Sequence, residues 1–555
     1  MNDFYTKRIK RRLVRHLNNW RIYQMARRVA SRAPDAQGRP IIFFKASSGI
    51  DDFSWNSAFQ VLTTWGLRLQ GVQVVFFACQ AGMSRCVLGT DRDNPAKAPP
   101  CRSCIYQART LYSGAQVEWF GFERDAVLEK AISGLSLAEL MVFERPFPSE
   151  MGMPKLGHDV ASSQRTLLAM TIPLGALCMP GLRWILRRHN LVDDEKTRFF
   201  LREYILSAWN VAREFEALLE RTQPQAVVVF NGQFYPEATA KWVAQQHGVR
   251  VVTHEVGLQP MTGFFTPGEA TAYPIDIPES FELNEAQNAR LDGYLEKRFR
   301  GNFSMAGIQF WADIKGLDEA FLAKTAGFKQ VVPVFTNVIF DTSQPHANTV
   351  FSDMFAWLDV VLETARARPE TLFVIRAHPD ETRAGKESQE SVAGWVAARG
   401  ADKLPNVVFV PPHEFLSSYE LIARARFVMI YNSTIGLEAS ILGAAVLCAG
   451  KARFTQYPSV FFPQTVPAYR ARLEELLSAE QIEVPAEFKR NARRFLYYQL
   501  FRTSLPFGAF LERGILPVNA RLGSFDPHEL LPVNSPAIAA VTKGLLGDGD
   551  FLLEE

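Results

Sequence analysis

Five short apolar runs that alternate with helical stretches restrict the fold of this chain more than any other feature. The runs are rich in Val, Ile, Leu and Phe, and polar or turn-forming residues separate each run from the next helical stretch. Alternation of this kind is typical of parallel strands joined by crossover helices. The expected strands are residues 331–335, 372–375, 407–410, 427–430 and 445–448. The pattern therefore predicts a doubly wound, Rossmann-like α/β domain over residues 326–475.

The first half of the chain repeats this alternation with a long interruption. The expected elements are strand 41–44, helix 55–69, strand 72–77, strand 226–230, helix 236–246 and strand 249–252. Residues 120–220, which separate them, are mainly helical in pattern. A chain of 555 residues, 47% of them hydrophobic, is long enough for two such cores. The sequence thus predicts a second Rossmann-like domain that carries a helical insertion.

We therefore expect an α/β protein in four parts. The parts are a basic N-terminal helix at 1–36, an N-terminal domain at 37–325 with a four-cysteine loop and the helical insertion, a C-terminal domain at 326–475, and a helical tail at 476–555. The tail shows no motif of its own.

Positive charge is concentrated in the first 35 residues. They hold ten Lys or Arg and two acidic residues, whereas the whole chain has 61 basic and 58 acidic residues. A general nucleic-acid binder shows a basic footprint across a folded domain instead, so nucleic acid is not an expected partner. Residues 4–32 are predicted to form a helix with apolar residues among the cations, namely Tyr5, Ile9, Leu13, Leu17, Trp20, Ile22 and Tyr23. Such a helix either packs on its own domain or lies on an anionic membrane surface.

The expected compartment follows from signals that the sequence lacks. Its first residues have neither the apolar stretch nor the small-residue cleavage site of a secretory signal. The least charged run, Thr166 to Leu182, is interrupted by Pro and Gly and is too short to span a bilayer. Six cysteines are too few for a disulfide framework in a chain of this length. We expect a cytoplasmic protein, peripheral on the cytoplasmic face of the inner membrane if the basic helix binds lipid.

Several chemistries lose support because their motifs are missing. The sequence has no G-x-x-x-x-G-K-[ST] phosphate loop, no G-x-G-x-x-G after a first strand, no H-E-x-x-H helix and no G-x-S-x-G elbow. Kinase, dehydrogenase, zincin and hydrolase activities are therefore not expected. Two Asp-x-Asp sequences, at 91–93 and 548–550, lie in polar loop or tail segments, where solvated carboxylates are the simpler interpretation.

The strongest site signal follows two strands of the C-terminal domain. Strand 372–375 ends in Arg376-Ala377-His378-Pro379, which places a cation and an imidazole at the carboxyl edge of the predicted sheet. Ligands of open α/β sheets bind at this edge. Taken alone, His378 has a simpler interpretation as a hydrogen-bonded histidine at a strand end.

The second strand, 427–430, is followed by Asn432-Ser433-Thr434 and a helix. Backbone N–H groups at a helix start bind phosphate, and Glu438, about one turn inside, could accept hydrogen bonds from ribose hydroxyls. Ordinary helix capping favours the same three residues. The joint occurrence of both motifs in one domain nevertheless predicts a nucleotide-phosphate site.

These motifs resemble the capsule polysaccharide biosynthesis family. The residues that carry the likeness are 376–379, 432–439, 443–446 and 450–452, with 230–232 and 254–260 in the first half. The family contains glycosyltransferases of the GT-B fold, including enzymes that transfer Kdo from its CMP-activated form. The resemblance covers roughly residues 225–460. It implies two Rossmann-like domains that face a cleft, and a nucleotide-sugar donor with a surface polysaccharide or glycolipid as acceptor.

A sugar transfer of this kind assigns roles to the candidate residues. The donor leaves as a nucleotide phosphate, and Arg376, His378 and the helix start after Thr434 suit its growing negative charge, so no catalytic metal is expected. If the reaction inverts the anomeric carbon, the first domain must supply a base for the acceptor hydroxyl. Asp52 and Glu255, which follow predicted strands, are the favoured candidates, with surface capping or ion pairing as the alternative for each.

Three other functions remain open from the sequence. A CDP-linked glycerol or polyol-phosphate transferase would use a similar His-Pro site. A nucleotide-sugar epimerase would need carboxylates close to the sugar ring. A capsule assembly or export component would keep the fold without turnover. Nucleotide affinity separates these functions, because CMP favours a Kdo-like donor, CDP favours the polyol-phosphate transferase, and no affinity counts against every enzyme.

Four cysteines beyond strand 72–77 form a separate pattern. Cys79, Cys86, Cys101 and Cys104 have the spacing C-x6-C-x14-C-x2-C. Two close pairs can supply four thiolates to a tetrahedral zinc ion that clamps a polar loop. An iron–sulfur cluster and unligated thiols are the alternatives. We predict a structural zinc, because a catalytic zinc would need an open ligand position, and we expect the other two cysteines, Cys178 and Cys448, in the core.

Overall fold

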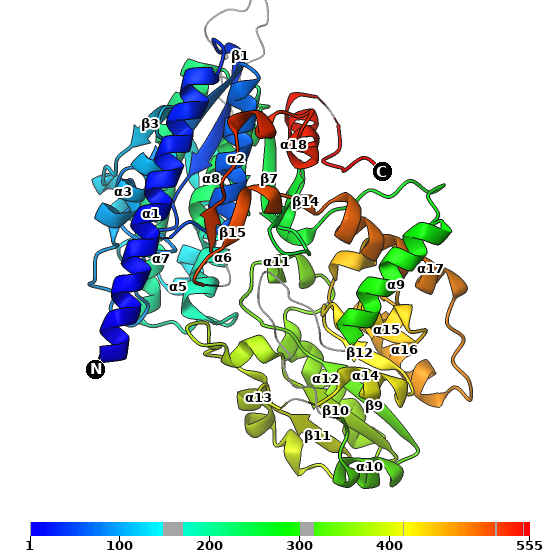
Figure 1. The fold of residues 1–555 in the computed structure, drawn as a ribbon. Coiled ribbons are helices and arrows are strands. Elements are labelled where there is room, and N and C mark those ends of the chain that lie inside the picture. The colour runs from blue at the N-terminus through cyan, green and yellow to red at the C-terminus, as the bar shows by residue number, and fades with distance from the viewer. Residues whose placement is uncertain are drawn as a thin grey trace, which may run out of the picture.

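Two α/β units make up this protein (Figure 1). The structure is a computed structural model that describes residues 2–50, 52–147, 170–299, 316–414, 416–516, 519–547 and 549–555, with side chains from residue 10 onward. The first unit is built on a seven-stranded sheet and the second on a five-stranded sheet.

The seven-stranded sheet of the first unit is parallel except at one edge. In spatial order its strands are β14 (Leu505–Pro506), β8 (Thr262–Thr266), β7 (Arg250–Val256), β6 (Ala226–Phe230), β1 (Gln37–Lys45), β2 (Val72–Cys79) and β3 (Gln116–Phe120). β8 runs antiparallel to β7, and β14 antiparallel to β8. The central strands are continuous apolar runs because helices cover both faces of the sheet.

Two layers of helices enclose that sheet. One layer contains α6 (Leu174–Leu186), α7 (Glu195–Thr222) and α8 (Tyr235–Gln246), and the other contains α1 (Asn2–Arg32), α2 (Trp55–Leu69) and α3 (Cys101–Leu111). Ile42 and Phe44 of β1 pack in the first layer's core, whereas Ile41 and Phe43 pack in the second, as the two-residue period of a strand requires. The insertion adds α4 (Ala126–Ile132), α5 (Leu137–Met141), β4 (Arg145–Phe147) and β5 (Met170–Ile172).

The second unit has a fully parallel sheet. Its strands are β9 (Gln330–Phe335), β10 (Thr371–Arg376), β11 (Val407–Val410), β12 (Val428–Ile430) and β13 (Val446–Cys448), in the order β11-β10-β9-β12-β13. Its helices include α12 (Met354–Ala367), α13 (Val392–Arg399), α14 (Ser418–Ala423), α15 (Ile435–Ile441) and α16 (Val466–Ser478). The strand order reverses beside β9, so the carboxyl ends of β10 and β12 flank a topological switch point, where ligands of such sheets bind.

Between the two sheets in sequence lie α9 (Glu285–Phe299) and α10 (Glu319–Ala326), and α11 (Gln344–Ala347) follows β9 within the second unit. The predicted fold class, two doubly wound Rossmann-like units with a helical insertion, is confirmed. Of the helices that the structure describes, none combines the length and the apolar character that crossing a bilayer requires.

The last eighty residues differ from the helical tail that the sequence suggested. After α17 (Ala486–Tyr497) the chain returns to the first unit and adds β14, the hairpin of β15 (Leu511–Arg513) and β16 (Ala520–Leu522), and α18 (Pro536–Leu546). Apolar residues between Leu505 and Phe551 complete the core on the α2 side of the first sheet. The sequence pattern missed these strands because two or three residues are too few to show a period.

Candidate functional site

A cavity of about 630 Å³ lies between the two units. The segments that follow β10 and β12 line it through His378 and through Asn432, Ser433 and Thr434. The loop after β8, in the first unit, lines it through Glu269 and other residues. The two motifs meet at one cavity because their strands flank β9 at the switch point of the sheet.

His378 lines this cavity as a half-buried side chain at the end of β10. Its Nδ1 accepts a hydrogen bond of 3.2 Å from the backbone N–H of Asp380. The neutral ring therefore carries its proton on Nε2, which is a hydrogen-bond donor. Burial lowers the pKa of His378, and the Asp380 carboxylate opposes that shift. Near neutral pH the ring can thus donate to an anionic oxygen atom of a ligand.

Residues 432–434 supply amide and hydroxyl groups beside His378. Asn432 Oδ1 accepts a hydrogen bond of 2.6 Å from Asn337 Nδ2, which also lines the cavity. Thr434 occupies the N-cap position of α15, yet its side chain makes no capping hydrogen bond. Among the residues that the structure describes, neither Ser433 nor Thr434 has a side-chain hydrogen-bond partner. These hydroxyls therefore differ from ordinary helix caps and can bind a ligand. The dipole of α15 contributes little, because the helix has only seven residues.

Lys451 and Arg453 bring positive charge to the same cavity, and the site prediction from sequence missed both. They follow β13, the last strand of the parallel sheet, so their position after a strand end was the available signal. The Arg453 guanidinium lies 4.1 Å from the centroid of the Tyr273 ring. Glu269, on the first unit, forms an ion pair with Lys241, so its negative charge is partly balanced. The cavity is therefore suited to an anionic ligand.

Arg376 and Glu438 do not line this cavity, although the motifs predicted both as ligand-binding residues. Arg376 is buried and donates hydrogen bonds to a backbone carbonyl and, at 2.7 Å, to Ser418 Oγ. Glu438 is buried in an ion pair of 2.5 Å with Arg298 and accepts a hydrogen bond from Tyr419. Arg298 thus balances the charge of Glu438, and the Arg376 guanidinium is held by hydrogen bonds. The geometry supports structural roles, in which the two residues support the loops that hold the site.

A second cavity, of about 440 Å³, adjoins the first. Trp184, Asp341 and Lys386 line both cavities, so the two are neighbours along the cleft. The rest of the lining of the second cavity comes mainly from strand ends of the first unit. A donor bound at the switch point and an acceptor bound by the first unit could therefore meet at their shared boundary.

Glu255, near the end of β7, lines this second cavity. Its carboxylate accepts hydrogen bonds from Asn56 Nδ2 at 3.1 Å and from Asn231 Nδ2 at 3.0 Å. Asn231 has φ of +60°, which is unusual for a residue with a side chain, and this turn brings its amide to Glu255. Burial raises the pKa of Glu255 although these hydrogen bonds oppose the shift. Glu255 is thus a positioned carboxylate with a raised pKa.

Two further titratable residues, Lys45 and Glu237, line the second cavity, and the sequence did not single them out. Burial lowers the pKa of Lys45 to about 8 and raises that of Glu237 to about 8, while their mutual attraction opposes both shifts. Lys45 also donates a hydrogen bond to Gln60, whose amide donates to His254 Nε2 at 2.6 Å. Lys45 lies at the end of β1 and Glu237 in the first turn of α8. They are far apart in the sequence, so only the fold shows that they interact.

Asp52, the other predicted base, lines neither cavity. Its carboxylate forms an ion pair of 2.5 Å with Arg11 of α1. The neighbouring residues Gly49 and Ser54 do line the second cavity. Asp52 therefore ties α1 to the loop after β1, and Glu255 is the predicted base that the structure places at a cavity.

The four cysteines predicted as zinc ligands, Cys79, Cys86, Cys101 and Cys104, line one small cavity of about 20 Å³. Cys79 and Cys86 each accept a 3.2 Å hydrogen bond from the backbone N–H of a glycine three residues later. Burial raises the pKa of the Cys86 thiol to about 12. Within the described ranges, no three or more Cys, His, Asp or Glu side chains form a group that could hold a metal ion. The zinc site stays a prediction.

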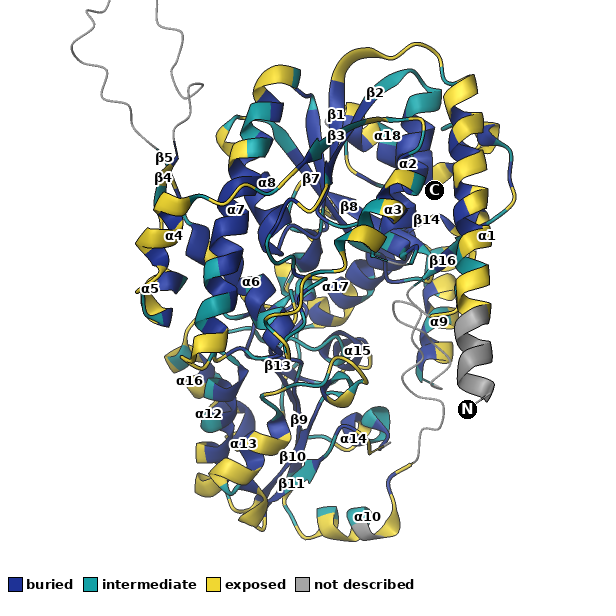
Figure 2. Cartoon of the chain, turned by 90° about the vertical axis from the view of Figure 1, so that its left-hand side faces the viewer, coloured by how far each residue is buried: buried dark blue, intermediate teal, exposed yellow. Residues whose placement is uncertain are grey.

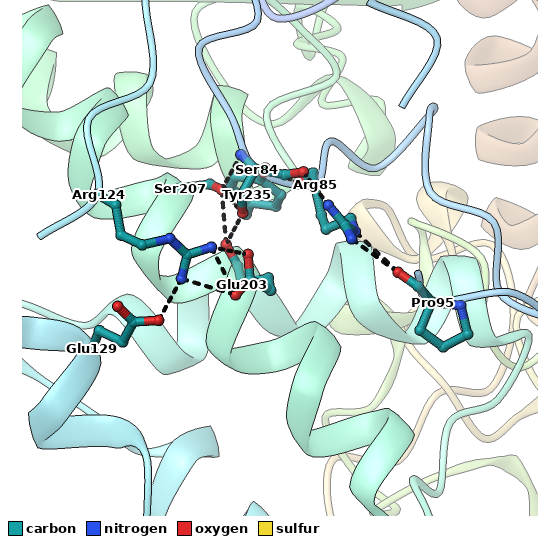
Figure 3. A network of polar contacts seen from close by, with 8 residues as sticks. All are labelled: Ser84, Arg85, Pro95, Arg124, Glu129, Glu203, Ser207 and Tyr235. Atoms are coloured by element: carbon teal, nitrogen blue, oxygen red, sulfur yellow. Dashed lines mark hydrogen bonds and ion pairs between the residues drawn. The ribbon is translucent and has the colours of Figure 1, made fainter. Parts of the chain in front are cut away.

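The loop after β2 is also held by polar contacts that involve no cysteine (Figure 3). The Ser84 backbone N–H donates to Ser207 Oγ at 3.1 Å, and the Ser84 hydroxyl lies 3.3 Å from the Glu203 carbonyl. Tyr235 donates a hydrogen bond to the carbonyl of Arg85. These contacts fix the loop to α7 and α8. The remaining two cysteines, Cys178 and Cys448, are buried as expected, and Asp548 of the second Asp-x-Asp sequence lies outside the described residues.

Solved structures with weak similarity to this chain include the following two. One is KpsC of Thermosulfurimonas dismutans, described as a beta Kdo 2,7 transferase, with 14% identity and a TM-score of 0.33 over 56% of this chain and 85% of that chain. The other is UDP-GlcNAc 2-epimerase from Neisseria meningitidis bound to UDP-GlcNAc, with 15% identity and a TM-score of 0.25 over 52% of this chain and 80% of that chain.

Sequence similarity to named proteins is more informative. The chain is 29% identical to Protein FixF of Sinorhizobium fredii over 228 residues, which are 40% of this chain and 48% of that protein. The match thus spans about half the length of this relative. Residues 313–457, which contain all five strands of the second sheet and both site motifs, match the family described as "Capsule polysaccharide biosynthesis protein". The resemblance to the capsule polysaccharide biosynthesis family that the motifs predicted is confirmed over this segment.

Proposed function

We propose that this protein is a glycosyltransferase that moves a sugar from a nucleotide-activated donor to a growing surface polysaccharide or glycolipid. The observation that carries the proposal is the pair of adjoining cavities between the units. One cavity has donors and cations suited to a nucleotide phosphate, and the other has a positioned carboxylate at Glu255. The family match of the second unit supports a surface glycan as product.

On the donor side, five side chains would stabilise the departing phosphate. They are His378, Ser433, Thr434, Lys451 and Arg453. Hydrogen-bond donors and cations that are already in place lower the energy of the negative charge that develops there in the transition state. We propose that they supply the charge for which other transferases use a divalent metal. Turnover should then continue in the presence of EDTA.

On the acceptor side, Glu255 would act as the base. Its carboxylate would accept the proton of an acceptor hydroxyl, whose oxygen forms a bond to the anomeric carbon. The bond between that carbon and the phosphate oxygen breaks, and its electron pair leaves with the nucleotide. A carboxylate with a raised pKa is a better proton acceptor near neutral pH than an ordinary one. Kdo carried by CMP is the specific donor that the family resemblance implies.

Nucleotide binding tests the donor site directly. Isothermal titration of the purified protein with CMP, CDP, UDP and GDP should reveal one preferred nucleotide, and a preference for CMP would support Kdo. His378→Ala should weaken that affinity by about 10- to 100-fold, because it removes a hydrogen bond to a charged oxygen. His413→Ala, at an exposed histidine of the same unit, is the matched control and should bind normally. Equal affinity of the two variants, or no affinity for any nucleotide, would contradict the proposal.

A further inference from the structure

The N-terminal helix α1 has an unpartnered apolar stripe on its outer face. Its inner face is buried in the core of the first unit through Ile22, Val29 and neighbouring residues. On the opposite face, Leu13, Leu17 and Trp20 are 59%, 54% and 61% exposed. Their spacing of four and three residues places them in one line along a helix of 3.6 residues per turn. Figure 2 shows α1 at the edge of the molecule with its outer side exposed.

Cations flank this stripe on both sides. At 100° per residue, Lys10 and Arg21 fall on one side of it, and Arg12 and Arg27 on the other. Lys10, Arg12 and Arg21 are exposed and form no ion pair with any residue that the structure describes. Two other basic residues of α1 pair with the first unit, Arg11 with Asp52 and Arg28 with Asp526. The outer cations therefore remain available to an external anion.

We propose that α1 docks this protein on an anionic lipid bilayer. Leu13, Leu17 and Trp20 would enter the boundary between headgroups and acyl chains, while the flanking cations contact lipid phosphates. Helices that lie in a membrane interface combine apolar side chains with basic residues in this way. Each cation near an anionic surface strengthens binding about five-fold.

Charge and shape favour lipid over the other possible occupants. A second copy of this chain would bring the same cations against each other, which is unfavourable. Nucleic acid would pair with the cations but offers no apolar surface to Leu13 and Leu17. An anionic bilayer satisfies both the cations and the apolar stripe. Because Arg11 links α1 to the loop beside the second cavity, docking would hold that cavity near the membrane.

Sedimentation with lipid vesicles tests the proposal on the full chain. The protein should bind vesicles of phosphatidylglycerol and phosphatidylethanolamine, and binding to pure phosphatidylcholine should be at least 10-fold weaker. Leu17→Glu with Trp20→Glu should weaken binding to the anionic vesicles at least 10-fold. Arg12→Gln with Arg21→Gln should weaken it about 25-fold and reduce its dependence on salt. Val127→Glu with Val142→Glu, at residues 75% and 73% exposed elsewhere on the first unit, is the matched control and should bind normally.

The outcomes are distinct from those of the proposed catalytic site. All four substituted positions of α1 are exposed, so the variants should fold, and their nucleotide affinity should equal that of the unchanged protein. Equal binding to anionic and neutral vesicles, or no binding to either, would overturn the proposal. The proposal would also be overturned if the protein bound no lipid but formed a dimer, or retained RNA, and the Leu17→Glu and Trp20→Glu substitutions abolished that association.

Discussion

The two carboxylates predicted as bases differ in their surroundings. Glu255 lines a cavity between two amide donors, whereas Asp52 is paired with Arg11 and lines no cavity. We expect Glu255→Gln to lower kcat by at least about 100-fold, the typical contribution of a general base, and to leave nucleotide affinity unchanged. Asp52→Asn should retain activity within a few-fold. Steady-state kinetics with donor and acceptor would check both variants, and loss of activity in Asp52→Asn alone would reverse the assignment.

Glu237 predicts a pH dependence of stability. Burial raises its pKa from 4.5 to about 8, so the folded state holds a proton that the unfolded state releases between these pH values. The free energy of unfolding therefore falls as the pH rises through this window. The Gln side chain of Glu237→Gln cannot lose a proton, so this variant lacks that pH dependence. The free energy of unfolding of the variant minus that of the unchanged protein should rise by about 3 kcal/mol between pH 4.5 and pH 7.

Urea denaturation at several pH values measures this difference. Glu123→Gln, at an exposed carboxylate of the same unit, should show the pH dependence of the unchanged protein. A constant difference between Glu237→Gln and the unchanged protein across this window would show that Glu237 ionises normally in the folded state.

The sequence predicted which loops form the donor site better than which side chains reach it. His378 and Ser433 both line the cavity because a residue just after a parallel strand must lie at the sheet edge. Glu438 lies elsewhere because Arg298, distant in the sequence, pairs with it. Lys451 lies in the segment 450–452 that carries the family likeness but was not predicted to bind a ligand, because its position after a strand end was its only local signal. Whether a side chain reaches the cavity depends on partners from distant segments of the chain, and a local sequence pattern does not show those partners.

At the scale of elements, long periodic segments were predicted well and edge strands were not. The predicted helix 55–69 and strand 226–230 have the bounds of α2 and β6. β14 was missed because two residues form a strand only where β8 offers an open edge. β8 was missed as well, because its residues were not expected to form a strand; once it pairs with β7, the short loop between them requires antiparallel pairing, since parallel neighbours need a crossover of a dozen or more residues.

The loop between β2 and α3 carries the metal prediction. Four cysteines line one cavity, and backbone N–H groups donate to two of the sulfur atoms, although the cysteines as they lie in the described structure do not form a metal-binding group. We expect elemental analysis of the purified protein to find about one zinc ion per chain. Cys101→Ser with Cys104→Ser should lose the zinc and lower the unfolding temperature. Cys178→Ala, which changes a buried cysteine outside the cavity, should keep it.

A metal-free protein with unchanged stability would remove the zinc proposal. The polar contacts of Ser84 and Tyr235 would then be sufficient to hold this loop. An iron–sulfur cluster, the other metal-bound alternative, would be visible in the absorption spectrum.

At the scale of the whole molecule, hydrogen bonds join the two units around the cleft. Thr271 of the first unit lies 2.8 Å from the His346 ring nitrogen, and Gln456 accepts a 3.0 Å hydrogen bond from the Ile275 backbone. Glu390 of the second unit also accepts hydrogen bonds from the backbone N–H groups of residues 189 and 190 of the insertion. These contacts bring the donor side and the acceptor side together, so the cavities belong to the pair of units and to neither alone.

The return of the C-terminal segment makes the first unit depend on the end of the chain. Ile538 of α18 is 1% exposed and lies in the core beside α2. Gly66 of α2 lets α18 pack close, because a Cβ at residue 66 would lie only 2.7 Å from Ile538 Cγ2. Ile538→Ala should lower the free energy of unfolding by about 2–5 kcal/mol, the usual result of a cavity in a core. Val533→Ala, at a residue 86% exposed, should change it by less than about 0.5 kcal/mol. Chemical denaturation of both variants would measure these changes. The prediction would be contradicted if a fragment of residues 37–325 unfolded cooperatively with full stability, because the first unit would then fold without the C-terminal segment.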